Sequence, residues 1–285
     1  MKVSLIVTIY KNNVSLLFLL ISILRQTLKD IEVIIINNSN KTNRLLTIFI
    51  NKAKFHVITI NDKLPISNLW NKAINMASGN YIMFLDNNDY LNNKALELIY
   101  NSKSDEDILV TNGYKRFLIF RYKSDFSFTK SDNNLYHEIL TNNKLIKRSI
   151  LLDNPFMNDI EIPNLSNMPI ILSNYKVRVL SYRVITSKVN NRLIFKYQDN
   201  LLDVIKMLDY IKPKLQVRDY KIIAIIEILY QLENYFYSNN NNENVLSKLK
   251  DKLYETDNYW FDYEIVKIIM KKDILFRYFI NHANL

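Results

Sequence analysis

Short apolar runs alternate with amphipathic segments along the first 90 residues of the chain. Runs rich in β-branched residues predict strands, and longer segments with helical periodicity predict helices. The predicted order is β-α-β-α-β-α-β, with strands over residues 3–9, 32–36, 56–60 and 81–85 and helices over residues 15–26, 44–53 and 68–77. Ser67 is expected to cap the third helix, and Gly79 stands at a position typical of a helix end.

Continuous apolar strands separated by helices predict a parallel sheet that helices cover on both faces. Ligands of such sheets bind beyond the carboxyl ends of the strands. Polar clusters follow three of the predicted strands, at residues 10–12, 37–40 and 86–89. These clusters should meet at one edge of the sheet. No glycine-rich phosphate-binding motif is present, which argues against a dinucleotide or P-loop site.

The pattern changes after residue 107. Strands are predicted over residues 108–110, 116–122 and 177–184, and helices over residues 200–211, 218–237, 245–254 and 263–282. We therefore expect an α/β fold with a mixed, mostly parallel sheet over residues 1–190. An all-helical region is expected over residues 191–285.

Composition narrows the chemistry. The chain has 285 residues, a net charge of +10, no cysteine and three widely separated histidines. Disulfides, cysteine nucleophiles and cysteine-based zinc sites are thereby excluded. The longest apolar run, residues 16–24, is about half of the roughly 20 residues that a membrane span needs. We expect a cytoplasmic protein with an anionic partner, and the absence of a nucleic-acid motif argues against DNA or RNA.

Four segments in unbroken order resemble glycosyltransferase family 2, which has the GT-A fold. They are the opening VSLIVTIYKN, the segment LRQTLKDIEVIII from residue 24, ISNLWNKAI from residue 66 and ASGNYIMFLDNND from residue 77. The resemblance implies a Rossmann-like sheet flanked by helices. It also implies a nucleotide-sugar-binding half over residues 1–115 and an acceptor half over residues 116–190.

The resemblance implies inverting transfer of a sugar from a nucleoside diphosphate sugar, such as a UDP-sugar, to a hydroxyl in surface glycan or polysaccharide synthesis. Carried over residue by residue, it places the nucleotide at Thr8, Tyr10, Asn12, Asn37, Asn38, Asn71, Asp86 and Asn87. A divalent metal, Mn²⁺ or Mg²⁺, would be held by Asp86, Asn88 and Asp89. The catalytic base falls among Asp159, Glu161 and Asn164, in a weakly aligned segment.

Several family aspartates are asparagines here, at Asn37, Asn38, Asn88 and Asn164. An amide binds Mg²⁺ or Mn²⁺ more weakly than a carboxylate does, and an amide cannot act as a general base. Two interpretations stay open. The chain is either an active hexosyltransferase that uses Asp86, Asp89 and one of Asp159 or Glu161, or an impaired relative that binds or scaffolds an active transferase. In the active enzyme, Asp89 takes over the metal, or metal binding is weak or absent because Asn88 replaces the ligand.

Other features also allow more than one interpretation. Trp70 either faces the sugar pocket or packs against the sheet. The cations at Arg121, Lys123, Arg178 and Arg183 either neutralise the diphosphate or form a solvated face. The apolar stripe of the last helix belongs to a core, to a dimer seam or to a surface that contacts the inner face of the membrane. Expected acceptors are a glycan, a lipid-linked glycan or a protein.

Overall fold

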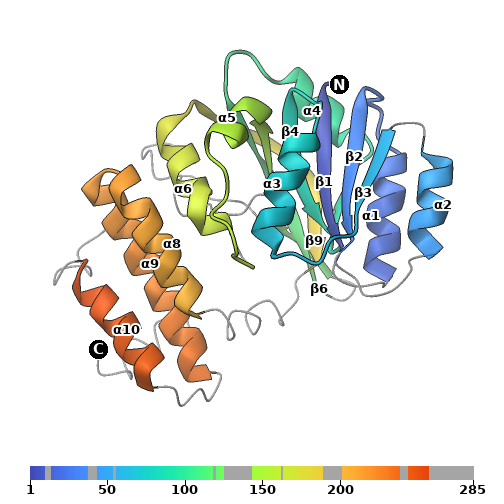
Figure 1. The fold of residues 1–285 in the computed structure, drawn as a ribbon. Helices are drawn as coiled ribbons and strands as arrows, with labels where there is room; N and C mark the ends of the chain where they lie inside the picture. The colour runs from blue at the N-terminus through green and yellow to red at the C-terminus, as the bar shows by residue number, and fades with distance from the viewer. Residues whose placement is uncertain are drawn as a thin grey trace. The chain divides into compact units, whose positions relative to one another are not determined.

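A computed structural model of the whole chain describes residues 1–9, 14–37, 44–53, 56–117, 120–124, 143–161, 163–188, 201–237 and 243–256. The chain divides into two compact units, Met1–Val189 and Asn190–Leu285. Figure 1 shows the elements of each unit. The predicted helix over residues 263–282 lies outside the described residues, as do the predicted site residues Tyr10, Asn12 and Asn38.

The first unit is built on a nine-stranded mixed sheet with the strand order β3-β2-β1-β4-β8-β6-β9-β5, and β7 pairs with β6. The strands are β1 (Val3–Ile9), β2 (Ile31–Asn37), β3 (His56–Ile60), β4 (Tyr81–Asp86), β5 (Asp89–Leu91), β6 (Ile108–Phe117), β7 (Phe120–Ser124), β8 (Lys144–Lys147) and β9 (Val177–Lys188). β1 to β4 are mutually parallel, β8 is antiparallel to β4 and β6, and β9 is parallel to β6. This arrangement confirms the predicted mixed, mostly parallel sheet.

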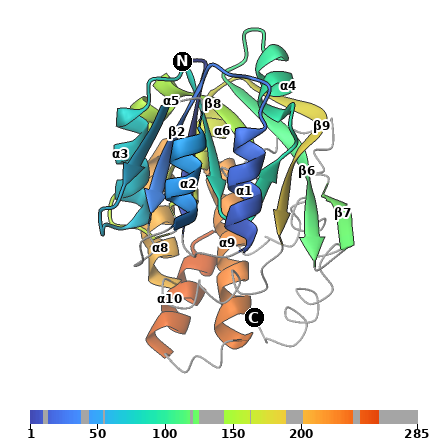
Figure 2. The same ribbon diagram turned by 90° about the vertical axis from the view of Figure 1, so that its right-hand side faces the viewer.

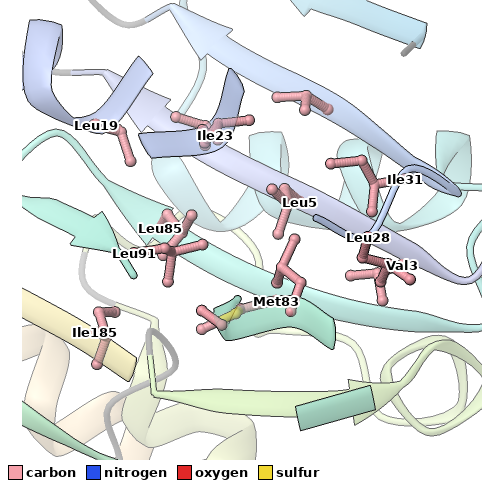
Figure 3. Close-up of a cluster of buried hydrophobic side chains, with 14 of the residues drawn as sticks. Val3, Leu5, Leu19, Ile23, Leu28, Ile31, Met83, Leu85, Leu91 and Ile185 are labelled. Carbon is pink, nitrogen blue, oxygen red and sulfur yellow. The ribbon is translucent and has the colours of Figure 1, made fainter. Parts of the chain in front are cut away.

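Successive side chains of a strand point to opposite faces of the sheet, and helices pack against both faces. Val3, Leu5 and Val7 of β1 join a core with α1 (Val14–Leu24), α2 (Arg44–Lys52) and α4 (Ala95–Asn101). Figure 3 shows part of this cluster. Ile6 of β1 joins a second core with α3 (Ile66–Met76), α5 (Arg148–Asp153) and α6 (Asn164–Asn174). Figures 1 and 2 show α1 and α2 on one side of the sheet and α3 on the other.

A buried carboxylate ties the strands together at the amino edge of the sheet. Glu32 is 2% exposed and accepts hydrogen bonds from Ser4 Oγ at 2.5 Å, Ser78 N at 2.5 Å and Gly79 N at 3.1 Å. Burial alone raises the pKa of Glu32, but these hydrogen bonds outweigh it, so the pKa is lowered. Glu32 therefore holds this edge as an ionised structural group.

Two local expectations about α3 were wrong. Ser67 does not cap the helix, which begins at Ile66 after Pro65. Gly79 does not adopt a left-handed conformation. A glycine is required there because a Cβ would lie 2.6 Å from Ser4 N and 2.8 Å from Val3 C. The close approach of β1 explains this glycine, and a helix end does not.

The second unit contains α8 (Leu201–Ile211), the short 3₁₀ helix Lys212–Lys214, α9 (Val217–Tyr237) and α10 (Glu243–Tyr254). These bounds agree with the predicted helices to within two residues. Lys252 is 6% exposed and forms ion pairs with Asp209 and with Glu255, the latter at 2.9 Å. Within the described parts of the chain, we find no helix that is both long enough and apolar enough to span a bilayer.

Candidate functional site

The carboxyl edge of the parallel strands gathers several predicted site residues. Thr8 of β1 is paired with Ile36 of β2 and with Asp86 of β4, and Ile9 is paired with Asn37. Asp86 and Asn37 therefore flank β1 at the edge where ligands of such sheets bind. Asn37 Nδ2 donates to Asn61 Oδ1 at 3.2 Å, just beyond β3.

The segment that follows β4 folds into a tight turn. Asp86 Oδ1 accepts the Asn88 N–H at 2.8 Å, and the Asp86 N–H donates to Asp89 Oδ2 at 3.1 Å. Burial raises the pKa of the Asp86 carboxyl, and the hydrogen bond from Asn88 opposes this shift. Asp89 is 1% exposed, whereas Asp86 and Asn88 are partly exposed. The turn thus leaves Asp86 and Asn88 accessible to a ligand. The buried Asp89 carboxylate stabilises the turn by accepting the Asp86 N–H.

These residues fit a divalent cation that takes most of its ligands from a substrate. One oxygen of Asp86 and one of Asp89 already accept hydrogen bonds in the turn. In the part of the chain that the structure describes, no three acidic or histidine side chains gather into a metal-binding group. Mg²⁺ commonly uses one or two carboxylates together with substrate phosphates and water. Asp86 and the Asn88 amide are the residues that would supply such a partial ligand set.

Thr8 and Trp70 are buried at the carboxyl edge of the sheet and bind to each other. Trp70 Nε1 donates to Thr8 Oγ1 at 3.0 Å, and the two residues are 7% and 1% exposed. The Trp70 ring lies 4.8 Å from the Phe84 ring and 5.0 Å from the Phe156 ring, between centroids. Of the two interpretations of Trp70, packing against the sheet is therefore the one that the structure shows. The predicted contact of Thr8 with a nucleotide stays a prediction.

A loop over residues 155–161 is bound to the polar face of α3. Ser67 exchanges hydrogen bonds with the backbone of Ile160, with the donors Ser67 N and Ile160 N each at 3.0 Å. Asn71 Nδ2 donates to Phe156 O at 2.8 Å, and Asn71 Oδ1 accepts Phe156 N–H at 3.0 Å. The Asn71 side chain therefore holds the backbone of Phe156 in place. Its predicted contact with the nucleotide stays a prediction.

Asp159, one candidate base, is held by the same face of α3. The Asp159 N–H donates to Asn68 Oδ1 at 2.7 Å, and Asn68 Nδ2 donates to Asp159 Oδ1 at 3.1 Å. Asp159 also has a positive φ of 59°, an uncommon conformation for a residue other than glycine. Because α3 follows β3 and packs back along the sheet, its first turn lies near the carboxyl edge. Asp159 is thus exposed and held in one position near that edge.

The two other candidate bases differ in their surroundings. Glu161 is exposed on the same loop. Asn164 is the first residue of α6, and its Oδ1 is buried without a hydrogen-bond partner among the residues that the structure describes. The structure therefore offers two carboxylates and one amide near the docked loop. The choice among them stays a prediction.

Sequence reasoning missed a buried cation, Lys144. It is 0% exposed, and its Nζ donates to Asn143 Oδ1 at 2.8 Å. β8 is antiparallel to β4 and its last residue, Lys147, pairs with Tyr81 at the amino edge, so Lys144 lies toward the carboxyl edge of the sheet, where it pairs with Val110 of β6. The segment KLIK carries no motif that marks this lysine. Only the direction of β8 in the sheet reveals that it lies toward the carboxyl edge.

The four cations considered from the sequence are placed differently. Arg178 lies near the amino edge, where its guanidinium donates to Ser102 O at 3.0 Å and to Glu106 at 3.2 Å, so a role at the diphosphate is wrong for Arg178. Arg183 lies on β9, and the backbone oxygen of Arg183 accepts Asn92 Nδ2. Arg121 and Lys123 belong to β7, but their side chains lie outside what the structure describes.

Comparisons with known proteins agree with this geometry. The family model of glycosyl transferase family 2 matches residues 4–158. A poly(ribitol-phosphate) beta-glucosyltransferase of Bacillus spizizenii is 28% identical over 166 residues, which are 54% of this chain and 26% of that protein. A cholesterol galactosyltransferase of Borreliella burgdorferi is 29% identical over 126 residues, which are 43% of this chain and 35% of that protein. The chain thus matches about a quarter to a third of the length of these relatives.

Solved structures show the same fold. The crystal structure of S. aureus TarS 1–349 in complex with UDP-GlcNAc superimposes with a TM-score of 0.62 at 18% identity, covering 83% of this chain and 73% of that one. At this identity the likeness establishes the fold. The family model covers 155 of the 285 residues and includes β1 to β4, Asp86 and α3. By that match the chain belongs to glycosyl transferase family 2.

Proposed function

We propose that this chain transfers a sugar from a nucleoside diphosphate sugar to a hydroxyl of a surface glycan or glycolipid, with inversion at the sugar carbon. Two observations outside the chain support the proposal. The relatives named above are a glucosyltransferase for a poly(ribitol-phosphate) and a galactosyltransferase for cholesterol. A structural neighbour, TarS, has been crystallised with UDP-GlcNAc and with UDP.

The turn at Asp86 carries the proposal, because it places a partly buried carboxylate at the carboxyl edge of the sheet beside β1. In this role Asp86 binds the donor, either directly or through a cation, and Asn37 contributes an amide on the other side of β1. The turn is held by hydrogen bonds among its own residues, so the carboxylate is oriented before a ligand arrives.

Mn²⁺ or Mg²⁺ would be held by Asp86 and Asn88 together with oxygens of the diphosphate. When bound, the ion supplies positive charge to the diphosphate as it leaves the sugar. Lys144 adds a protein-borne positive charge close to the same edge. The neutral Asn88 amide binds Mg²⁺ more weakly than a carboxylate does, so we expect modest metal affinity and residual donor binding after chelation.

The acceptor hydroxyl needs a base within hydrogen-bond reach. Asp159 fits this role because Asn68 holds it in place on a loop that α3 anchors. In the proposed step, Asp159 accepts the hydroxyl proton as the acceptor oxygen forms its bond to the sugar carbon. The bond from that carbon to the diphosphate oxygen breaks on the opposite side. Glu161, on the same loop, is the alternative base.

Binding of UDP-GlcNAc and other UDP-sugars to the full chain tests the donor site. Calorimetry with Mn²⁺ should show binding that Asp86→Asn weakens at least tenfold. Asp62→Asn is a matched control, because Asp62 is an exposed partner of Lys72 beyond β3. Failure of the wild-type chain to bind any nucleotide sugar, or equal binding by Asp86→Asn, would contradict the proposal.

An impaired relative that scaffolds an active transferase is the second candidate. It is favoured by Asn164, an amide that cannot take a proton, at the family position of the base. Under this proposal, the wild-type chain binds donor but forms no glycoside, and Asn164→Asp together with Asn88→Asp creates activity. Turnover by the wild-type chain that Asp159→Asn abolishes would exclude the scaffold role. A cytoplasmic location at the inner membrane face stays a prediction.

A further inference from the structure

A cavity of about 490 Å³ opens at the amino edge of the sheet, away from the Asp86 turn. Its walls come from the segment that leads into β4 (Gly79 to Tyr81), from the end of α4 and the residues just after it (Tyr100 and Lys103) and from the junction of β8 with α5 (Lys147 and Arg148). In Figure 2 the N terminus, α4 and α5 gather at this end of the sheet. Tyr81 and Asp86 are the two ends of β4, so about 17 Å of strand separates the cavity from the donor site.

The cavity is lined by cations that the protein holds in place. Arg148 Nε donates to Ile74 O and its terminal nitrogen donates to Asn75 O, both at 3.1 Å. These contacts orient the guanidinium but do not neutralise it. Lys147 is paired with Asp107 at 2.7 Å. Lys103 and Arg148 have no acidic partner among the described residues, and both are only partly exposed.

Two tyrosine rings, those of Tyr81 and Tyr100, form another part of the wall. The Tyr100 and Tyr81 rings meet edge to face, with centroids 6.0 Å apart. Lys103 Nζ lies 4.7 Å from the centre of the Tyr100 ring, and Lys2 Nζ lies 5.3 Å from it. Two ammonium groups therefore lie against one ring. Such an arrangement attracts an anion, while the ring faces offer contact to C–H groups.

We propose that this cavity is a second ligand site, which binds the phosphate of a phosphorylated polyol or sugar unit. Lys103 and Arg148 contact the phosphate, with Lys2 at the rim, and the tyrosine rings pack against the carbon chain. The cavity volume falls within the range of small-molecule sites and exceeds what one phosphate fills, so several carbons fit beside it. Arginine and lysine together suit phosphate oxygens. Because the site lies at the far edge of the sheet, it binds independently of the donor.

Titration of the full chain with glycerol 3-phosphate, followed by calorimetry and by phosphorus NMR, tests the site. Binding should weaken as salt is raised, and uncharged glycerol should not bind. Lys103→Glu should weaken binding by a factor of ten or more, because it replaces an attractive charge with a repulsive one. Lys94→Glu is the matched control, since Lys94 is exposed at the other end of α4 and should leave binding unchanged. Lys103→Gln provides a milder variant if the charge reversal fails to fold.

Vesicles distinguish a lipid headgroup from a soluble source of the same phosphate. Binding to phosphatidylglycerol vesicles but not to phosphatidylcholine vesicles, lost in Lys103→Glu, supports the site with a headgroup as its ligand. Binding to glycerol 3-phosphate in solution supports it with a soluble ligand. Saturating UDP should leave either signal unchanged, and this holds even if the proposed transferase activity is absent. Competition by UDP, equal loss in Lys94→Glu, or no binding to either probe would overturn the inference.

Discussion

Replacing Asn71 with alanine separates a structural role from a nucleotide contact. Asn71 lies on α3, and its amide makes both possible hydrogen bonds to the backbone of Phe156, at 2.8 and 3.0 Å. A third contact, from the same nitrogen to Asn158 Oδ1, is 3.2 Å long. Phe156 is 2% exposed. The truncated side chain would leave the N–H and the C=O of Phe156 without partners at a site that water reaches poorly.

The expected cost follows from those two groups. Each partly buried backbone group that loses its partner costs about 1–3 kcal/mol, so the pair costs about 3 kcal/mol after partial rehydration. In a unit as large as Met1–Val189, this corresponds to a fall in the melting temperature of roughly 6–12 °C. Asn71→Asp should also destabilise, because a carboxylate oxygen would replace the amide nitrogen against Phe156 O.

Thermal unfolding and UDP binding, measured on the same preparations, provide the assay. Asn75→Ala is the control, because Asn75 is exposed on the same helix. We expect Asn71→Ala to lose stability, to keep donor affinity within about threefold, and to lose turnover, since its loop carries Asp159 and Glu161. An unchanged melting temperature with a large loss of UDP affinity would refute the reasoning and make Asn71 a nucleotide ligand.

Three further substitutions test residues that contribute to stability and lie outside the candidate site. Gly79→Ala should destabilise the first unit by about 3 kcal/mol in urea unfolding, because its Cβ meets backbone atoms of β1. Burial raises the pKa of Glu227 in α9 to about 7, so the unfolding free energy should fall as pH rises from about 4.5 to 7. Glu227→Gln should remove up to about 3 kcal/mol of that fall. Lys252→Met should change stability by less than about 1 kcal/mol, since both acidic partners stay in solvent.

The strands β1, β2 and β4 could be predicted because nearly all of their consecutive residues are buried, whereas β3 is buried only at Ile60 and was predicted from its β-branched residues. β1 is buried at every position from Val3 to Ile9, and β2 from Ile31 to Ile36, so each appears as a mostly apolar run, interrupted only at Ser4, Thr8 and Glu32. β5 and β8 were missed because they have three and four residues, and polar residues contribute to each. Their identity depends on the strands beside them. The helices α4, α5 and α6 were missed as well, because their sequences show no clear helical periodicity of apolar residues.

The residues of the candidate site also fall into two groups, those whose place could be predicted from the sequence and those whose place could not. Asp86 and Asn37 could be placed because a parallel strand delivers its next residues to a known edge. The roles of Ser67, Asn68 and Asn71 could not be placed, because their partners lie between 85 and 93 residues away on a loop without regular structure. A polar residue on a helix face shows only that a partner or water is needed. Only the tertiary structure shows which residue the partner is.

The asparagines of this chain therefore do not all bear on catalysis in the same way. Asn68 and Asn71 each donate and accept at once, which an aspartate in the same place does not do. Their amides are what the docked loop requires. At Asn88 the backbone N–H completes the turn, and the side chain is not needed for it. An aspartate at position 88 would fit the same turn, so an asparagine there would weaken the proposed metal site, and its side chain makes no hydrogen bond among the described residues that would compensate.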